Sequence, residues 1–291
     1  MSFDGVLVPI ITPCDDSGAV DTKALEQLVE HFISQGVAGI IACGTTGEYY
    51  SFSESERQVV LETIAKAGKG RVTLIAGANA FNAKGAIENA KQAEEMGYEG
   101  LMLAPPSYSL PCQEGVKHFY TTVADATSLP IIMYNFPDRV GINIELDTLI
   151  ELAKHPRIIG VKESSGDFSH ALALVQANIP NFQVVCGCDD QAADFLFWGI
   201  TSWISGSANV FPGEQVQMMK AAAAGDYAET KRLMSAMYPV IQSMEAEGYN
   251  QKAKLAAQRF GISAGAVRSP LAPLPKEKEE QFVQLLAEFK V

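Results

Sequence analysis

Eight short apolar runs, each of strand length and most of them rich in β-branched residues, recur through the first two thirds of the chain. They occupy residues 5–12, 36–43, 71–77, 100–105, 130–135, 157–163, 182–187 and 201–206. The segments between them carry apolar residues at helical spacing. Because parallel strands need long crossovers, this alternation of strand and helix predicts a parallel sheet. Eight such units within about 210 residues match the length of a (β/α)8 barrel.

The competing fold is an open, doubly wound sheet, which usually has fewer strands and a Gly-x-Gly-x-x-Gly fingerprint after the first strand. No such fingerprint follows the first strand here. We therefore expect an α/β protein whose catalytic TIM barrel covers residues 1–224.

The strand signal stops after Phe211-Pro212, and the remaining sequence has helical spacing. The pattern predicts helices over 216–244, with a break at Gly225-Asp226, over 251–259 and near the end of the chain, after a proline-rich loop at 268–275. This part, residues 225–291, is expected to form a small C-terminal helical domain.

The 291-residue chain has a formal net charge of −12 and no run of Lys or Arg, which disfavours nucleic acids and anionic membranes as partners. No apolar run is long enough to span a bilayer, and no export signal is visible. The five cysteines and four histidines are scattered, a pattern that predicts neither a metal site nor a disulfide framework. We expect a cytoplasmic protein with reduced thiols, no metal and no cofactor.

A glycine-rich corner, GTTGE at residues 44–48, follows the second apolar run. Ser53 and Glu56 have capping-box spacing and predict a helix that starts near Phe52. A strand, a corner and a helix in this order leave backbone N–H groups free beside two threonine hydroxyls. Such a corner can be a plain turn, or it can bind a carboxylate.

Lys162 and Tyr134 lie at the ends of the sixth and fifth apolar runs. Active sites of (β/α)8 barrels are built at the carboxyl ends of the strands. A lysine that points into the barrel is partly desolvated, which favours the neutral amine that attacks a ketone to form a Schiff base. Taken singly, a lysine at a strand end is ordinarily a charged group in contact with solvent, and a tyrosine in an apolar run ordinarily packs in the hydrophobic core. Their placement together with the Thr-Thr corner favours a site.

The motifs GTTGE, YNFPDRVG and GVKESSG, in this order and spacing, resemble those of the dihydrodipicolinate synthase and N-acetylneuraminate lyase family. The resemblance covers nearly the whole chain. It implies a (β/α)8 barrel with a helical C-terminal domain that condenses or cleaves 2-oxo acids through a lysine Schiff base.

The resemblance also implies roles for single residues. Lys162 matches the Schiff-base lysine, and Tyr134 the tyrosine that relays protons near the imine. Thr45 and Thr46 match the pair that holds the pyruvate carboxylate, with Thr45 also in the hydroxyl relay. Tyr108 matches a tyrosine that completes the relay across a subunit interface, so we expect a homo-oligomer, either a dimer or a dimer of dimers. Ile204 matches a position whose backbone carbonyl faces the bound keto acid.

Two features point to different branches of the family. Arg139 matches the arginine with which synthases bind the carboxylate of the second substrate, and guanidinium suits bidentate carboxylate binding. Gly187 and Asp189, in GCDD, resemble the form found in sugar-acid lyases, where acids hold substrate hydroxyls. Tyr49, Tyr50 and Phe81 occupy stretches that are polar in lysine-inhibited synthases, so we do not expect inhibition by lysine.

We favour a condensation like that of 4-hydroxy-tetrahydrodipicolinate synthase, because of Arg139. The alternative is a catabolic enzyme that cleaves a sugar-derived 2-oxo acid or N-acetylneuraminate, or that deaminates a hydroxypyrroline carboxylate. A barrel that binds a keto acid only as a regulator is a third reading, and the presence of Lys162 and Tyr134 disfavours it.

Overall fold

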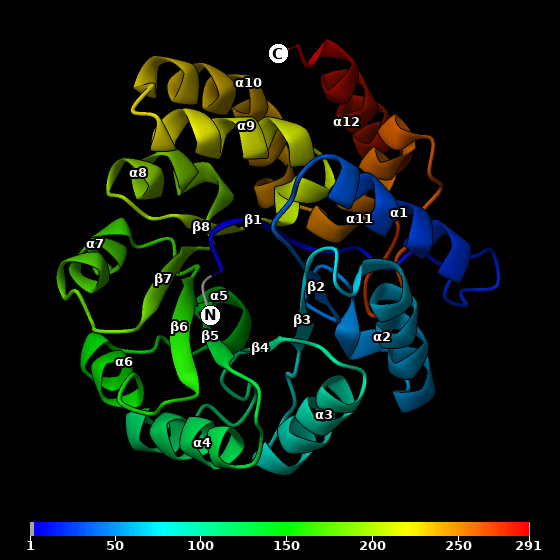
Figure 1. Ribbon diagram of the computed structural model, residues 1–291. Coiled ribbons are helices and arrows are strands. Elements are labelled where there is room, and N and C mark those ends of the chain that lie inside the picture. The colour runs from blue at the N-terminus through cyan, green and yellow to red at the C-terminus, as the bar shows by residue number, and fades with distance from the viewer. Residues whose placement is uncertain (1–2, 291) are drawn as a thin grey trace.

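The computed structural model describes residues 3–290 and shows a closed barrel of eight parallel strands in chain order (Figure 1). The strands are β1 (Gly5–Pro9), β2 (Gly39–Ala42), β3 (Thr73–Gly77), β4 (Gly100–Leu103), β5 (Ile131–Asn135), β6 (Ile158–Glu163), β7 (Gln183–Cys186) and β8 (Ser202–Ile204). β8 pairs with β1 and closes the barrel. Each strand lies within one of the eight apolar runs, so the expected TIM barrel is confirmed.

Helices surround the barrel and continue beyond it (Figure 1). Those that follow β1 to β8 are α1 (Thr22–Ser34), α2 (Glu54–Gly68), α3 (Ala83–Glu95), α4 (Gln113–Asp125), α5 (Pro137–Val140), α6 (Leu146–Leu152), α7 (Phe168–Gln176), α8 (Ala192–Phe197) and α9 (Pro212–Ala223). The C-terminal helices are α10 (Tyr227–Ala246), α11 (Tyr249–Ala256) and α12 (Lys276–Glu288). Within residues 3–290, none of the helices is long and apolar enough to cross a membrane.

The predicted break at Gly225-Asp226 separates α9 from α10. Gly225 has φ +75°, a conformation that glycine adopts at little cost, and Asp226 caps α10 by accepting a hydrogen bond from the backbone N–H of Glu229. α10 packs against α8 and α9, so the C-terminal helices lie directly on the barrel. The division into domains at residues 224 and 225 stays a prediction.

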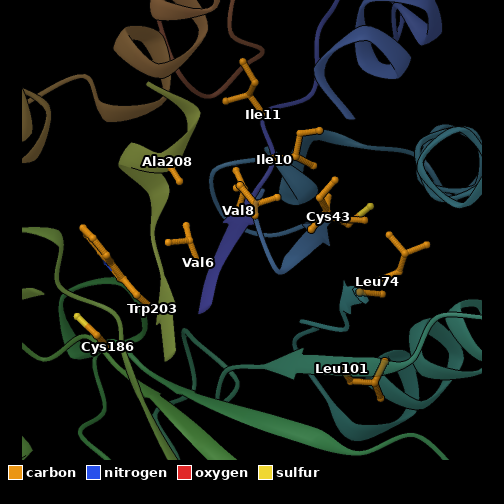
Figure 2. Close-up of a cluster of buried hydrophobic side chains, with 14 of the residues drawn as sticks. Val6, Val8, Ile10, Ile11, Cys43, Leu74, Leu101, Cys186, Trp203 and Ala208 are labelled. Atoms are coloured by element: carbon orange, nitrogen blue, oxygen red, sulfur yellow. The ribbon is translucent and has the colours of Figure 1, made fainter. Parts of the chain in front are cut away.

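Alternation along the strands divides the apolar side chains between two cores. Val6 and Val8 of β1 point outward into a large cluster between strands and helices, to which Trp203 of β8 also belongs (Figure 2). Leu7, between the two valines, belongs to the cluster that fills the barrel interior. The interior cluster consists of Phe3, Leu7, Ile41, Ile75, Met102, Ala104, Ile132, Tyr134, Val185 and Ile204.

Candidate active site

The register of β5 and β6 places Tyr134 and Lys162 side by side. Tyr134 pairs with Lys162 and Asn135 pairs with Glu163. Tyr134 belongs to the interior cluster, and the Lys162 side chain is only 6% exposed, with its Nζ 4.4 Å from the centroid of the Tyr134 ring. A buried amine beside a phenol therefore lies at the carboxyl end of the barrel.

Two features fix this pair. The register shifts between Ile131 and Ile132, whose partners are Ile158 and Gly160, so one extra residue on β6 brings Lys162 level with Tyr134. Behind the pair, Asn135 Nδ2 donates to Glu163 Oε2 at 2.8 Å. The same carboxylate accepts from a backbone N–H of the following loop, that of Ser165, at 2.7 Å. The strand ends are thus tied together by buried hydrogen bonds.

The GTTGE corner leaves β2 through a left-handed residue, Cys43 with φ +51°, and ends in another, Glu48 with φ +59°. Gly47 is tightly packed, because a Cβ there would lie 2.8 Å from the carbonyl oxygen of Ile10. The backbone then makes a 3-10 turn over Tyr49–Ser51 before α2 begins.

The predicted capping box of α2 is present. Ser53 Oγ accepts from the N–H of Glu56 at 3.3 Å, and Glu56 Oε2 accepts from the N–H of Ser53 at 2.9 Å. The helix begins at Glu54, so its start was placed within two residues. Thr46 of the corner is buried and Thr45 is partly exposed. Their direct contact with a carboxylate stays a prediction.

Gly187 packs against the lysine. A Cβ at this position would overlap Ser164 Oγ and approach Lys162 Cγ to 2.8 Å, so only glycine leaves the lysine stem its present path. Ser164 Oγ is itself buried and has no hydrogen-bond partner among the described residues. Ile204 is the last residue of β8, which puts its carbonyl at the same end of the barrel.

Asp189 is 2% exposed and its carboxylate accepts three hydrogen bonds. The donors are Trp203 Nε1 at 3.0 Å, the N–H of Ser207 at 2.8 Å and the hydroxyl of Tyr249 at 2.7 Å. The donors belong to β8, to the 3-10 turn over Gly206–Asn209 and to α11, so the Asp189 carboxylate ties these three segments together. Its predicted contact with a substrate is untested.

Charged groups of both signs lie at the mouth of the barrel. Arg139, in the short helix α5, is exposed, and its Cζ lies 5.8 Å from the ring centroid of Phe136. Glu245, near the end of α10, lies close enough to Arg139, Lys162 and Asp190 to interact with their charges. Glu245 is exposed at the surface of the single chain, yet protein surrounds its carboxyl group closely enough for desolvation, followed by the negative charges of Asp189 and Asp190, to raise its pKa to about 7. The mouth therefore combines one guanidinium with acids that can bind hydroxyl or amine groups.

Tyr108 does not reach the barrel of its own chain. Its side chain is 93% exposed, and its backbone has φ +76°, which is unusual for a tyrosine. Leu110, two residues on, is also exposed and left-handed. The side chain to which the resemblance assigns a part in the proton relay is thus almost fully exposed in the single chain.

A separate cavity of about 930 Å³ lies beside the corner, between the segments around α2 and α3. Tyr49, Tyr50 and Phe81 all line it, and Lys162 and Tyr134 do not. Within the described part of the chain, no group of three His, Cys, Asp or Glu residues could hold a metal ion.

Sequence reasoning missed Glu245 and Ser164, and it missed two residues of α11 that contact the corner: Asn250, which donates to the carbonyl oxygen of Thr45, and Lys254, which pairs with Glu48. Ser164 could have been found, because alternation after Lys162 points it to the same side of the strand. The other three lie in the C-terminal helices, about 80 residues or more from the lysine, and no local pattern relates them to the corner or the mouth.

The fold and the pair at the strand ends define a class of protein, a TIM barrel with a buried lysine and a tyrosine side by side at the carboxyl ends of its strands. The model of the dihydrodipicolinate synthetase family matches residues 2–289. The 4-hydroxy-tetrahydrodipicolinate synthase of Exiguobacterium sp. is 35% identical, with 99% of this chain and 98% of the relative covered. That of Acidiphilium cryptum is 36% identical, with 96% of each covered.

Solved structures agree. Chloride-inhibited dihydrodipicolinate synthase from Acinetobacter baumannii, complexed with pyruvate, superposes with a TM-score of 0.95 at 34% identity and 98% coverage of both chains. Dihydrodipicolinate synthase DapA-2 from Bacillus anthracis gives a TM-score of 0.96 at 27% identity and full coverage of both. The chain belongs to the dihydrodipicolinate synthetase family and is an enzyme of that family.

Proposed function

We propose that the protein forms a Schiff base between Lys162 and pyruvate or a related 2-oxo acid, and condenses it with a second substrate as 4-hydroxy-tetrahydrodipicolinate synthase does. The observation that carries this proposal is the buried Lys162 amine, 4.4 Å from the ring of Tyr134 on the neighbouring strand. The amine attacks the keto carbon and water leaves. The imine then acts as an electron sink for the bond made beyond the carbonyl.

The other residues take the roles that the resemblance to the family implies. Thr45 and Thr46 bind the carboxylate of the keto acid, Tyr134 moves protons at the imine, and the carbonyl of Ile204 faces the bound acid. Relatives over the whole chain length carry the synthase name, and one solved relative is complexed with pyruvate. Both facts support pyruvate as the first substrate.

Borohydride reduction tests the covalent step. Treatment with borohydride and pyruvate should add the mass of the reduced adduct, and peptide mapping should place it on Lys162. Lys162→Ala should lose both the adduct and turnover. If the wild type forms no adduct with any 2-oxo acid tested, the proposal is wrong.

A second candidate is cleavage of a sugar-derived 2-oxo acid, and the acids at the mouth favour it. Glu245 lies close enough to Asp190 and to Arg139 to interact with their charges, and carboxylates suit the hydroxyls of a sugar chain. A panel of aldehydes and cyclic imines, assayed with pyruvate, separates the two. An aldehyde that carries a carboxylate, which Arg139 could bind, should give the highest kcat/KM if the synthase proposal is right.

The proposal includes a homo-oligomer and a cytoplasmic location. Tyr108 supports the first, because its exposed side chain is free to enter the site of a neighbouring subunit. Mixing inactive Tyr108→Phe chains with inactive Lys162→Ala chains tests it. If Tyr108 acts across an interface, hybrids contain one intact site and activity returns. If it acts within its own chain, the mixture stays inactive.

A further inference from the structure

Residues of the C-terminal segment converge on the GTTGE corner although they lie some 200 residues away in the sequence. Lys254 of α11 is 2% exposed, and its Nζ forms an ion pair with Glu48 Oε1 at 2.7 Å. The same ammonium donates to the carbonyl oxygen of Ala266 at 2.7 Å. An ion pair this deeply buried is costly to break, because removal of one partner leaves the other charge without compensation.

Two more contacts reach the corner from the same segment. The backbone N–H of Arg268 donates to the second oxygen of Glu48 at 2.7 Å. Asn250 Nδ2 donates to the carbonyl oxygen of Thr45 at 3.1 Å and to the hydroxyl of Tyr50 at 3.3 Å. Residues at both ends of the corner are therefore held by side chains or backbone of the C-terminal segment.

The backbone of the corner needs such support. Glu48 adopts φ +59°, a left-handed conformation that costs free energy for a residue with a Cβ. Strained backbone persists only where the surrounding structure enforces it. The Glu48 backbone is hydrogen-bonded to Thr45 and Ser51 within the corner, and both oxygens of its carboxylate are engaged by the C-terminal segment. Contacts from outside the barrel therefore add to those that hold this conformation.

We propose that Lys254 and Asn250 are positioning residues, which hold the GTTGE corner in the shape that binds the carboxylate of the 2-oxo acid. This inference rests on the proposed function. It gives α11 a role in substrate binding that acts through the corner. Loss of either contact should weaken keto-acid binding and leave the covalent chemistry of Lys162 intact.

The chain offers a matched control for each variant. Lys252 is also a buried lysine of α11, but its Nζ donates to the carbonyl oxygen of Ser243 in α10 and not to the corner. Gln251 donates through its side-chain amide to the carbonyl oxygen of Ala272 within the C-terminal segment. Lys254→Met is therefore compared with Lys252→Met, and Asn250→Ala with Gln251→Ala.

The experiment has two readouts. Both are measured under conditions in which circular dichroism shows that the variants are folded. Pyruvate is titrated under borohydride trapping, and intact mass gives the concentration that labels half of the chains. Misplacement of a binding group should raise this concentration about 10- to 100-fold in Lys254→Met and about tenfold in Asn250→Ala, with the final extent of labelling unchanged. Lys252→Met and Gln251→Ala should match the wild type.

Amide hydrogen exchange of residues 43–52 is the second readout and requires no catalysis. Exchange there should be faster in Lys254→Met and Asn250→Ala than in their controls. The inference would be overturned if a variant and its control changed the labelling and the exchange equally, or if neither changed them. In that case, labelling of the wild type by pyruvate would still uphold the proposed function. If Lys254→Met does not fold, the Asn250→Ala and Gln251→Ala pair decides, since neither leaves a buried charge unpaired. A wild type without any adduct would overturn the proposed function itself.

Discussion

The two halves of the candidate site are held by different means. The Lys162 and Tyr134 half lies on two paired strands, and its geometry follows from register, one bulge and the Asn135–Glu163 hydrogen bond. The corner half lies outside the regular sheet, and side chains from the distant C-terminal segment hold it. The relative position of two paired strands is held by many backbone hydrogen bonds, so loss of one side chain changes it little. The conformation of a corner is held by few contacts, so loss of one of them changes it more. We therefore expect mutations in the first half to affect chemistry and those in the second to affect binding.

The largest effect is expected in the strand-held half. Tyr134→Phe removes the hydroxyl beside the imine and should lower kcat by the roughly 10²- to 10⁴-fold typical of a lost acid–base group. Steady-state turnover at saturating pyruvate checks it. Tyr98→Phe is the control, because the Tyr98 hydroxyl is also buried and donates to the carbonyl oxygen of Leu61 away from the site. Wild-type turnover by Tyr134→Phe would contradict the assignment.

A smaller effect is expected in the corner. Thr46→Val keeps the shape of the side chain but removes a hydroxyl, and loss of one hydrogen bond to a carboxylate should raise the KM for pyruvate about 10- to 100-fold. The kcat should change little. Thr148→Val, at a buried threonine of α6, is the control. A fall in kcat without a change in KM would break the proposed division between chemistry and binding.

Arg139 extends the comparison to the second substrate. Arg139→Ala should raise the KM for that substrate about tenfold, because a guanidinium pairs with a carboxylate through two parallel hydrogen bonds. The KM for pyruvate should stay the same. Arg139→Lys keeps the charge but not the bidentate geometry and should recover only part of the loss. Equal losses for both substrates would assign Arg139 to general structure.

The smallest effect is expected at the rim, from Glu245. Its pKa is raised to about 7 in the folded protein, so ionisation costs more in the folded than in the unfolded state. This cost is absent below the unfolded pKa, near the ordinary value of 4.5, and is complete above 7. Glu245→Gln should thus raise the stability relative to wild type at about pH 8 and not at about pH 4, by less than about 1 kcal/mol because solvent screens the rim. Urea unfolding at both pH values measures this, and a gain confined to low pH would contradict it.

Much of the molecule could be predicted from local sequence. Every expected strand forms, the Ser53 and Glu56 capping box is present, and the chain breaks at Gly225-Asp226 as expected. These features depend on neighbours within a few residues, where alternation, capping and backbone preferences act. The position of Lys162 at a strand end was predicted for the same reason.

Only the tertiary structure decided how those pieces meet. The bulge on β6 sets Lys162 opposite Tyr134, and no pattern in either strand specifies that register. The three donors around Asp189 and the Lys254–Glu48 ion pair join residues that are separated in sequence by 14 positions or more. Periodicity reports which face of an element is buried, but not which distant side chain covers it. The sequence by itself therefore determined the barrel and which reactive side chains lie at its strand ends, and the closed fold decided which distant residues contact them.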